Sequence, residues 1–522
     1  MLDSIALKLL CVAAASATVA AMLIPLASRI ATAIGLVDKP DAKRKLHERP
    51  IPMIGGIVIF LTTSLVTLLA ISRFGHLFSS QIQTLPAFHW EHLGLLSASL
   101  ILLGVGVLDD FFKIRGSYKL IGQIIAATIL IGFGYYFDEI RVSGTQIQFG
   151  VFSILIVYFW LLGAVNSVNL LDGADGFAGT LGLVVSIAIS VMAVFVGGAK
   201  TVDAVIAASL GGALVGFLLF NLPPAKIYLG DAGSMVIGLV LGALAISTSF
   251  KEQTFYALVA PIAILSIPIL DSTVAIIRRK MTGRGIYAVD RGHIHHNLLS
   301  QGLSPKMAVL WMFVLCGTTA AGGVLSFITR ESEFAIISIV LVVGFLVAGR
   351  IFGFAEFRMI GSKVKGVTNR ILPGKAGDRD SQEYQLQGTR DWGKLFGMVR
   401  SFAIEHGFRK ITLDINAPWI HESYHGTWKS PASGITEAHE EWESTLPLIL
   451  ESQLYGRLII VAAGDECNAY RCIPELIEAI STTGEEVIRQ DPLFPRAKST
   501  AAQPDRNESE PPRMEDSGVL SR

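Results

Sequence analysis

The chain has 522 residues, of which 51% are hydrophobic and only 16% are charged, and its formal net charge is zero. This zero averages two unlike parts, because residues up to about 355 are largely apolar and the remainder is polar. The cysteines are scattered, without C-x-x-C spacing or nearby histidines, which argues against a disulfide framework or a zinc knuckle. They are Cys11, Cys316, Cys467 and Cys472.

The apolar part is a succession of stretches, most of them near the roughly 20 residues that cross about 30 Å of hydrocarbon. We expect about eleven transmembrane helices, at 4–26, 53–73, 93–112, 119–137, 149–166, 177–196, 203–220, 234–250, 255–277, 307–328 and 334–353. The first stretch contains Ala-x-Ala sequences like those of a cleaved signal. However, Asp3 precedes any basic residue and apolar character continues to Leu26, so we expect a retained helix.

Basic residues predict the orientation of these helices. The connection after the first helix contains Arg29, Lys39, Lys43, Arg44, Lys45 and Arg49, and alternate connections contain most of the remaining basic residues of this part. The positive-inside bias therefore predicts an N-terminus outside the cell and a C-terminal domain in the cytosol. In this topology every strongly polar cluster of the apolar part lies on the cytosolic side.

The composition changes after Phe354. Segment 355–390 is basic and glycine-rich and is predicted to be a linker, and the tail 496–522 is predicted to be disordered. Between them, segment 391–490 has helical and strand-like patterns at Asp391–His406, Lys410–Ile415, Leu446–Leu450, Gly456–Ala463 and Ile473–Ile480. The predicted fold class is an all-α polytopic membrane bundle over residues 1–354, with a C-terminal cytosolic accessory α+β domain.

Two adjacent carboxylates, Asp109 and Asp110, end the third predicted helix. They repel one another and oppose the helix macrodipole, so a metal ion or a nearby cation should offset their charge. The nearby cations are Lys113, Arg115 and Lys119. We interpret one carboxylate as a general base or substrate ligand that its neighbour assists, and two solvated carboxylates in a loop as the alternative.

The segment Asn166-Ser-Val-Asn169-Leu-Leu-Asp172-Gly-Ala-Asp175-Gly is more specific. Its polar residues recur at every third position, so they approximate one helical face until the glycines break the helix. Hard oxygen ligands separated by flexible backbone suit Mg²⁺ better than softer metals. A polar turn between two helices is the alternative.

A further segment, from Asn221 to Ser234, leads into the eighth predicted helix and contains Gly230-Asp231-Ala-Gly233. The N–H groups and the positive dipole end of a helix N-terminus form an anion site. Because glycines near Asp231 let backbone or metal approach closely, we interpret Asp231 as a ligand. A simple N-cap is the alternative.

Three histidines, His293, His295 and His296, follow Arg291 in a long basic loop. They could bind zinc, but no further soft ligand lies nearby in the sequence. Roles as donors to a diphosphate or as acid–base groups therefore fit better.

Asp271 lies alone within the ninth predicted helix, six residues before its end. An ionisable residue inside a membrane helix is a functional candidate by default. Pairing with Arg278 or Arg279 is the structural alternative.

The chain has no Walker A lysine, Rossmann glycine fingerprint or Ser/His/Asp hydrolase motif, so ATP-driven chemistry of a familiar kind is not indicated. A transporter would place its ionisable residues near the bilayer midplane, whereas these lie at helix ends. A scaffold with a decayed membrane core disagrees with the intact motif residues. Metal-assisted phosphoryl chemistry on a membrane-bound substrate is the leading hypothesis.

Five ordered motifs over about residues 35–310 resemble those of the polyprenyl-phosphate N-acetylhexosamine-1-phosphate transferases, the bacterial WecA/MraY superfamily. They are Lys45-x-His47 with Pro50-x-Pro52 and Gly55-Gly56, then Leu108-Asp109-Asp110, Asn166 to Gly176, Pro224 to Ser234, and His293-Ile-His295-His296. The eleven-helix, N-out topology of that family agrees with the topology expected above. The segment after 355 lies outside the shared core.

The histidine motif with Asp290-Arg291 before it resembles the WecA and TagO branch, since MraY typically has three adjacent histidines. This resemblance implies transfer of N-acetylglucosamine-1-phosphate, or a related HexNAc-1-phosphate, from a UDP-N-acetylhexosamine to undecaprenyl phosphate at the bacterial inner membrane. UMP would be released and a lipid-linked cell-surface polysaccharide started. An MraY-like phospho-MurNAc-pentapeptide transferase is the alternative. We expect contact with membrane lipid and none with nucleic acid, and a homodimer remains open.

The resemblance also implies Mg²⁺, with Mn²⁺ as a substitute, and a role for each motif. It implies Asp231 as the best metal ligand, with Asn169 or Asp175 completing or orienting the site. Asp109 would deprotonate or position the lipid phosphate, with a covalent aspartyl intermediate as the alternative. The other catalytic candidates are Asp110, Asp172, Asp175, His293, His295 and His296, and the substrate-binding candidates are Lys45, His47, Asn166, Asn169, Asp271 and Arg291.

Overall fold

The computed structural model describes residues 2–38, 50–78, 90–137, 139–142, 145–196, 200–249, 254–285, 290, 292–361, 381–388, 390–417, 420, 422–430, 441–450, 453–463 and 471–489. Three predicted site residues, Lys45, His47 and Arg291, lie outside these ranges. The tail predicted at 496–522 also lies outside them.

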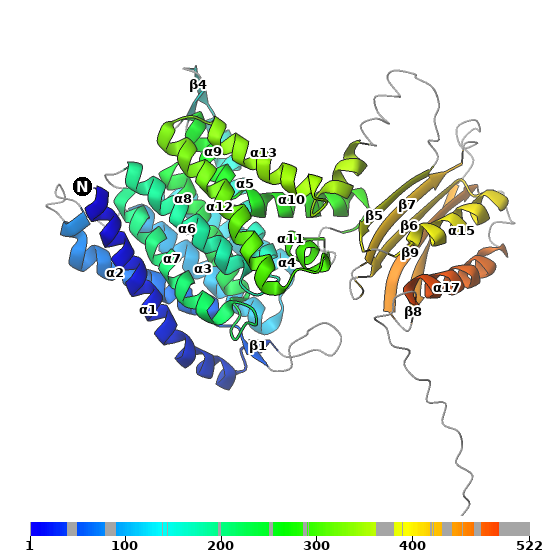
Figure 1. The fold of residues 1–522 in the computed structure, drawn as a ribbon, viewed down its shortest axis with the longest axis horizontal. Helices are drawn as coiled ribbons and strands as arrows, with labels where there is room; N and C mark the ends of the chain where they lie inside the picture. Colours follow the sequence, from blue (N-terminus) through cyan, green and yellow to red (C-terminus); the bar gives the residue numbers. More distant parts are fainter. Residues whose placement is uncertain are drawn as a thin grey trace, which may run out of the picture.

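A helical bundle forms one side of the molecule and a domain with a β-sheet forms the other (Figure 1). The bundle contains α1 (Leu2–Ile34), α2 (Gly55–Phe78), α3 (Trp90–Phe112), α4 (Gly116–Gly132), α5 (Val151–Leu171), α6 (Phe177–Val196), α7 (Thr201–Asn221), α8 (Gly230–Thr248), α9 (Phe255–Ile264), α10 (Ser266–Met281), α11 (Ile294–Ser300), α12 (Pro305–Thr329) and α13 (Glu333–Ala348). Two short antiparallel hairpins connect bundle helices, β1–β2 (Val37–Asp38 and Ile51–Pro52) and β3–β4 (Glu139–Val142 and Thr145–Gln148).

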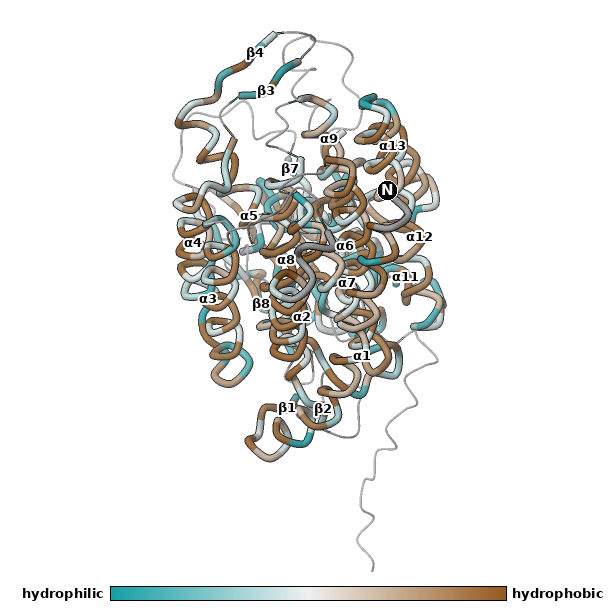
Figure 2. The backbone as a smooth tube through the Cα atoms, turned by 90° about the vertical axis from the view of Figure 1, so that its left-hand side faces the viewer, coloured by the Kyte–Doolittle hydropathy of each residue, from teal (hydrophilic) through white to brown (hydrophobic). Residues whose placement is uncertain are grey.

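Within the described residues, 8 helices are long and apolar enough to cross a membrane, or 9 if α9 and α10 form one bent span. Figure 2 shows the bundle helices predominantly in the hydrophobic colour. The spans expected at 119–137 and 334–353 correspond to shorter apolar helices, α4 and α13. The multi-pass membrane bundle is thereby confirmed, whereas the number of eleven spans stays a prediction.

The single helix expected at 255–277 is wrong, because α9 and α10 meet at an angle of 72°. Pro268 has no N–H group to donate a helical hydrogen bond, and in a continuous helix its ring would clash with the carbonyl of Ile264, the last residue of α9. From this break α10 runs toward the sheet domain (Figure 1) and carries Arg278, Arg279 and Lys280 in its last turn.

Helix α8 is the core of the bundle, and its residues 232–248 are all buried. Glycines let two neighbouring helices, α2 and α3, approach the first turn of α8 closely. A Cβ at Gly106 of α3 would run into the backbone of Ala232, and a Cβ at Gly56 of α2 would run into the backbone of Gly233. Small residues at such contacts are the usual way in which membrane helices pack closely. The packing therefore places Asp231, in the first turn of α8, next to the end of α3.

The C-terminal domain is an antiparallel five-stranded sheet with two helices on one face. The strand order is β5 (Ser381–Gln387), β7 (Glu422–Lys429), β6 (Lys410–Ala417), β9 (Gln453–Ala463) and β8 (Glu441–Leu450). The helices are α15 (Trp392–Glu405) and α17 (Ile473–Arg489). Their apolar residues form one core with Ile411, Leu413 and Ile415, which alternate along β6.

The segment predicted as a linker, 355–390, is partly structured. It contains most of a helix at 354–361 and all of the edge strand β5. The strand has no apolar alternation because it pairs on one side only and most of its side chains are exposed or half-buried. The sequence pattern also does not predict strand β7, because its buried positions include the polar residues Ser423 and His425.

Candidate active site

The ends of α3, α4 and α8 meet at a cluster of two carboxylates and one lysine. Lys119 Nζ lies 2.7 Å from Asp109 Oδ2 and also pairs with Asp231 Oδ2. The side chain of Asp109 is 5% exposed, whereas those of Lys119 and Asp231 are 23% and 27% exposed. Lys119 and Asp231 are therefore the accessible members, and Asp109 contacts them from a buried position. From the sequence, Lys119 is expected only as a charge that could offset Asp109 and Asp110.

Asp110 makes contacts that differ from those of its neighbour. Its Oδ1 accepts a hydrogen bond from the N–H of Asp231 at 3.0 Å, and its Oδ2 accepts one from the N–H of Ala232 at 3.3 Å. Gly230 has φ +74°, a conformation that favours glycine, and a Cβ there would lie 2.5 Å from Asp110 Oδ2. Asp110 thus caps the first turn of α8 and orients Asp231.

Helix α5 brings two amides to the cluster. Asn169 Nδ2 donates to Asp231 Oδ1 and to Ser234 Oγ, both at 2.9 Å. One turn earlier, Asn166 and Gln123 of α4 exchange side-chain hydrogen bonds of 2.8 and 3.2 Å. No motif marks Gln123; only its position four residues after Lys119, on the same face of α4, could have indicated it.

The glycine-rich turn after α5 holds two further carboxylates. Asp172 is half-buried. Burial, followed by the charges of Asp231, Asp110 and Asp175, raises its pKa well above the ordinary value. Asp175 Oδ2 accepts a hydrogen bond from the N–H of Ala225 at 2.9 Å, which ties this turn to the segment that leads into α8.

The charges of this region fit a divalent cation. The charges of Asp231, Asp110 and Asp175 act on Asp172 and contribute to its raised pKa, and a cation would offset this repulsion. Within the described ranges, no three His, Cys, Asp or Glu side chains form a ready metal-binding group. Mg²⁺ is commonly held by one or two carboxylates together with substrate phosphates, so the donor set suits that mode of binding.

The segment with the histidines is held by Asp271, which is fully buried. Its Oδ2 lies 2.8 Å from His293 Nδ1, and its Oδ1 accepts a hydrogen bond from the N–H of Ile294 at 2.8 Å. Arg278 and Arg279, the expected alternative partners, instead lie 3.1 and 3.6 Å from Asp290 Oδ2. The acid within α10 therefore fixes the first turn of α11.

His295 joins the histidine segment to the turn after α5. It is 1% exposed, and a Cβ at Gly173 would lie 3.1 Å from its Nε2. The ring of Phe177 packs edge-on against it at 5.6 Å, and the ring of His296 lies 4.2 Å away. Burial, followed by the charge of His296, lowers the pKa of His295 to about 3, so the imidazole is neutral at physiological pH. Four of the five sequence motifs thus meet in one region.

Comparison with known proteins agrees with these motifs. The model of the family described as "Glycosyl transferase family 4" matches residues 92–249. The probable undecaprenyl-phosphate N-acetylglucosaminyl 1-phosphate transferase of Bacillus subtilis is 31% identical over 317 residues, which cover 60% of this chain and 84% of the relative. The chain belongs to glycosyl transferase family 4.

Two further relatives of this family 4 chain have related names. The decaprenyl-phosphate N-acetylglucosaminephosphotransferase of Mycobacterium tuberculosis is 31% identical, over 60% of this chain and 82% of the relative. The undecaprenyl-phosphate alpha-N-acetylglucosaminyl 1-phosphate transferase of Escherichia coli is 27% identical, over 67% of this chain and 92% of the relative. These names confirm the resemblance to the WecA and TagO branch.

Proposed function

We propose that the protein transfers N-acetylglucosamine-1-phosphate from UDP-N-acetylglucosamine to undecaprenyl phosphate, with release of UMP, and so starts a lipid-linked cell-surface polysaccharide. The names of its family 4 relatives support the acceptor and the sugar. The observation that carries the proposal is the convergence of Asp109, Lys119, Asn169 and Asp231 at one end of an apolar bundle. That is where a lipid phosphate and a water-soluble nucleotide sugar can meet.

In the proposed reaction, an oxygen of the lipid phosphate attacks the phosphorus that is bonded to the sugar. The new P–O bond forms while the bond from that phosphorus to the oxygen of UMP breaks, so a diphosphate joins lipid and sugar and UMP leaves. Two anions must approach one another, and neutralisation of their charge is the main catalytic requirement. Mg²⁺, bound by Asp231 together with Asn169 or Asp175, would supply that neutralisation.

The residues of the chain have distinct roles in this proposal. Lys119 offers an ammonium group between Asp109 and Asp231, where it can bind a phosphate oxygen. Because Asp109 is buried, we assign to it the positioning of the lipid phosphate through Lys119. Asp110 orients Asp231 through the first turn of α8. The histidines form a wall of the site, in which Asp271 fixes His293 and the imidazole of His295 is neutral.

We further propose that the site faces the cytosol at the bacterial inner membrane, with the N-terminus outside. Eleven spans result if α4 and α13 cross the bilayer and α9 with α10 count as one. The basic connections support this orientation, since positive residues favour the inner side. The first turn of α8 and the ends of α3 and α5 then lie at the inner surface.

Replacement of Asp231 by Asn tests the assignment, with Asp203→Asn as a matched control. Both acids lie in the first turn of a bundle helix and near a lysine. Asp203, however, lies at the N-terminal end of α7, whereas the opposite end of α7 leads into the segment before α8 and Asp231. Purified protein is assayed for Mg²⁺-dependent release of UMP from UDP-N-acetylglucosamine and undecaprenyl phosphate. We expect Asp231→Asn to lower the rate at least about 100-fold and Asp203→Asn to leave it near wild type per folded molecule.

An undiminished rate in Asp231→Asn would show that the metal assignment is wrong. The same assay with UDP-N-acetylgalactosamine and UDP-MurNAc-pentapeptide identifies the donor. Preference for UDP-MurNAc-pentapeptide would contradict the proposed sugar while leaving the reaction class intact.

A further inference from the structure

The sheet of the C-terminal domain buries a carboxylate on the face that its helices leave open. Asp414 lies on β6, directly opposite Arg457 of β9 and His425 of β7. It points away from Leu413 and Ile415, which belong to the core, yet it is only 3% exposed. Burial raises its pKa, but the nearby side chains of His425 and Arg284 outweigh that effect and hold the pKa below the ordinary value. Asp414 is therefore a charged group that needs a cationic partner.

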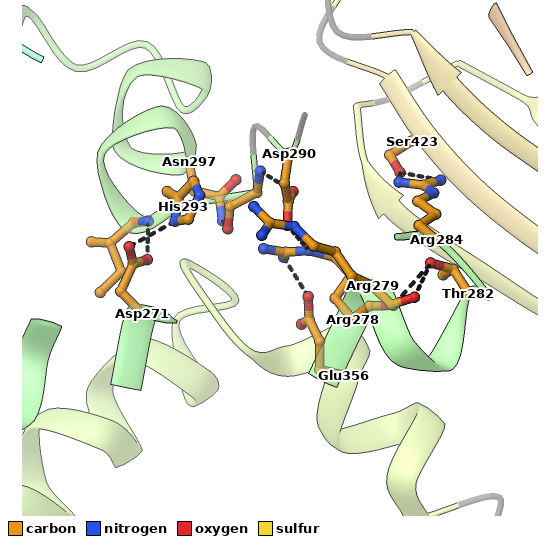
Figure 3. A network of polar contacts seen from close by, with 12 residues as sticks. Asp271, Arg278, Arg279, Thr282, Arg284, Asp290, His293, Asn297, Glu356 and Ser423 are labelled. Carbon is orange, nitrogen blue, oxygen red and sulfur yellow. Dashed lines mark hydrogen bonds and ion pairs between the residues drawn. The ribbon is translucent and has the colours of Figure 1, made fainter. Parts of the chain in front are cut away.

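Arg457 of the sheet lies 3.4 Å from Asp414 Oδ2, and the membrane bundle supplies a closer cation, Arg284, at 2.8 Å from Oδ1. Arg284 follows the end of α10 by three residues and binds Asp414 through two hydrogen bonds, Nε to Oδ2 at 3.1 Å and Nη2 to Oδ1 at 2.8 Å. It also contacts Ser423, as Figure 3 shows, and donates to the carbonyl of Ile415. A paired guanidinium–carboxylate geometry of this kind is directional and binds more strongly than neutral hydrogen bonds.

A second arginine crosses the junction in the opposite direction. Arg457 Nη2 donates to the carbonyls of Thr282 and Gly283 at 3.3 and 2.8 Å, which lie at the C-terminal end of α10. The carbonyls at a helix end have no hydrogen-bond donors inside the helix, so the guanidinium of Arg457 supplies donors and a favourable positive charge there. Together with Arg284, it fixes the end of α10 to the sheet.

The same helix also holds the histidine segment. Arg278 donates to Asp290 at 3.1 Å and to Glu356 at 2.5 Å, and Asp290 accepts a hydrogen bond from the N–H of Gly292 at 2.9 Å. Seven residues earlier in α10, Asp271 binds His293. Figure 3 shows the contact of Asp271 with His293 and that of Arg278 with Glu356, with the contact of Arg284 with Ser423 beyond them. The segment before α11 is thus bound at several points to a helix whose far end is bound to the sheet.

We propose that the C-terminal domain is a positioning module for the histidine segment, which it holds through α10 by the contact of Arg284 with Asp414. The expected effect on kcat rests on the proposed function. Arg284 and Asp414 are positioning residues, since neither touches the carboxylate–lysine cluster. With the sheet docked, α10 has a fixed direction and His293 and His295 keep their places. When the sheet is undocked, α10 and α11 lose that constraint.

The test compares full-length Arg284→Gln, Asp414→Asn and the double variant with wild type. Arg284→Gln leaves the sheet itself unaltered, so it remains informative if Asp414→Asn impairs the folding of the domain. Lys394→Gln is the control, because Lys394 pairs with Glu486 on exposed surfaces of the domain helices, away from the junction. Two quantities are measured: hydrogen exchange of the amides of α11, and kcat and KM for UDP-N-acetylglucosamine.

We expect faster exchange in α11 and a kcat about tenfold lower, with KM within about twofold, for each junction variant. The double variant should match the single variants, because all three remove one shared contact. Lys394→Gln should resemble wild type. The proposal is overturned if exchange rises at 282–284 while α11 and kcat stay unchanged, if the single effects add, or if Lys394→Gln has the same effect. A wild-type protein without transfer activity would refute the proposed function alone, since the exchange measurement still decides the coupling.

Discussion

The adjacent carboxylates at the end of α3 have different partners, and substitution of Asp110 separates their roles. Asp110 is buried and accepts hydrogen bonds from the N–H groups of Asp231 and Ala232. Alanine would leave both donors without an acceptor, at a cost of about 1–3 kcal/mol each and so roughly 2–6 kcal/mol in total. Asparagine keeps one acceptor oxygen and loses the charge, so we expect about half of that cost.

The functional consequence follows from the position of Asp231 in the turn that Asp110 caps. A displacement of about 1 Å at a reacting group can lower a rate by roughly 100-fold. We therefore expect kcat for UMP release to fall about 100-fold in Asp110→Ala and about tenfold in Asp110→Asn. The loss of thermal stability in detergent should follow the same order.

The assay measures kcat at saturating substrates and the midpoint of thermal unfolding for wild type and both variants. A positioning role requires graded losses of both quantities, with Asn milder than Ala. If Asp110→Asn is as inactive as Asp110→Ala while both unfold at the wild-type temperature, the carboxylate acts directly in the reaction and the reasoning is wrong.

Two further predictions concern the contact between the turn after α5 and the histidines. Gly173→Ala would place a Cβ 3.1 Å from His295 Nε2 and should lower kcat about tenfold, whereas Gly163→Ala, with nothing within 4 Å of its Cβ, should leave kcat unchanged; equal effects would contradict the contact. The pKa of His295 is about 3 in the folded protein and roughly 6.5 when unfolded. Because the unfolded chain binds the proton first, stability should fall by roughly 1.4 kcal/mol per pH unit as the pH drops below about 6.5. His295→Gln should remove this loss of stability. If the unfolding midpoints of wild type and His295→Gln change equally from pH 7 to pH 5, the prediction is wrong.

Much of the architecture could be predicted from local patterns. Apolar runs of helical length indicated the bundle, because a segment that crosses hydrocarbon must satisfy its own backbone hydrogen bonds. In the C-terminal domain, the strand pattern at Lys410–Ile415 and the helical pattern at Asp391–His406 correspond to β6 and α15. The edge strand β5 could not be found in this way, since its side chains bury little apolar surface.

The candidate site was predicted in part. The family resemblance implies that Asp231 and Asn169 or Asp175 share one site, and the structure joins Asn169 to Asp231 by a hydrogen bond. The roles of Lys119 and Gln123 were not predictable, since a single lysine or glutamine in an apolar helix has no characteristic spacing. The bend between α9 and α10 had a signal in Pro268, but a proline within a membrane helix is often tolerated.

Taken alone, the sequence determined which residues can do chemistry and that they lie at the ends of membrane helices, because residue type and the length of apolar runs are local properties. Tertiary structure alone decided that Asp110 caps α8 while Asp109 contacts Lys119, and that a distant sheet binds the end of α10. Those outcomes depend on how closely helices approach at Gly56 and Gly106 and on which groups their packing buries. Distances of this kind arise only when segments far apart in the chain meet.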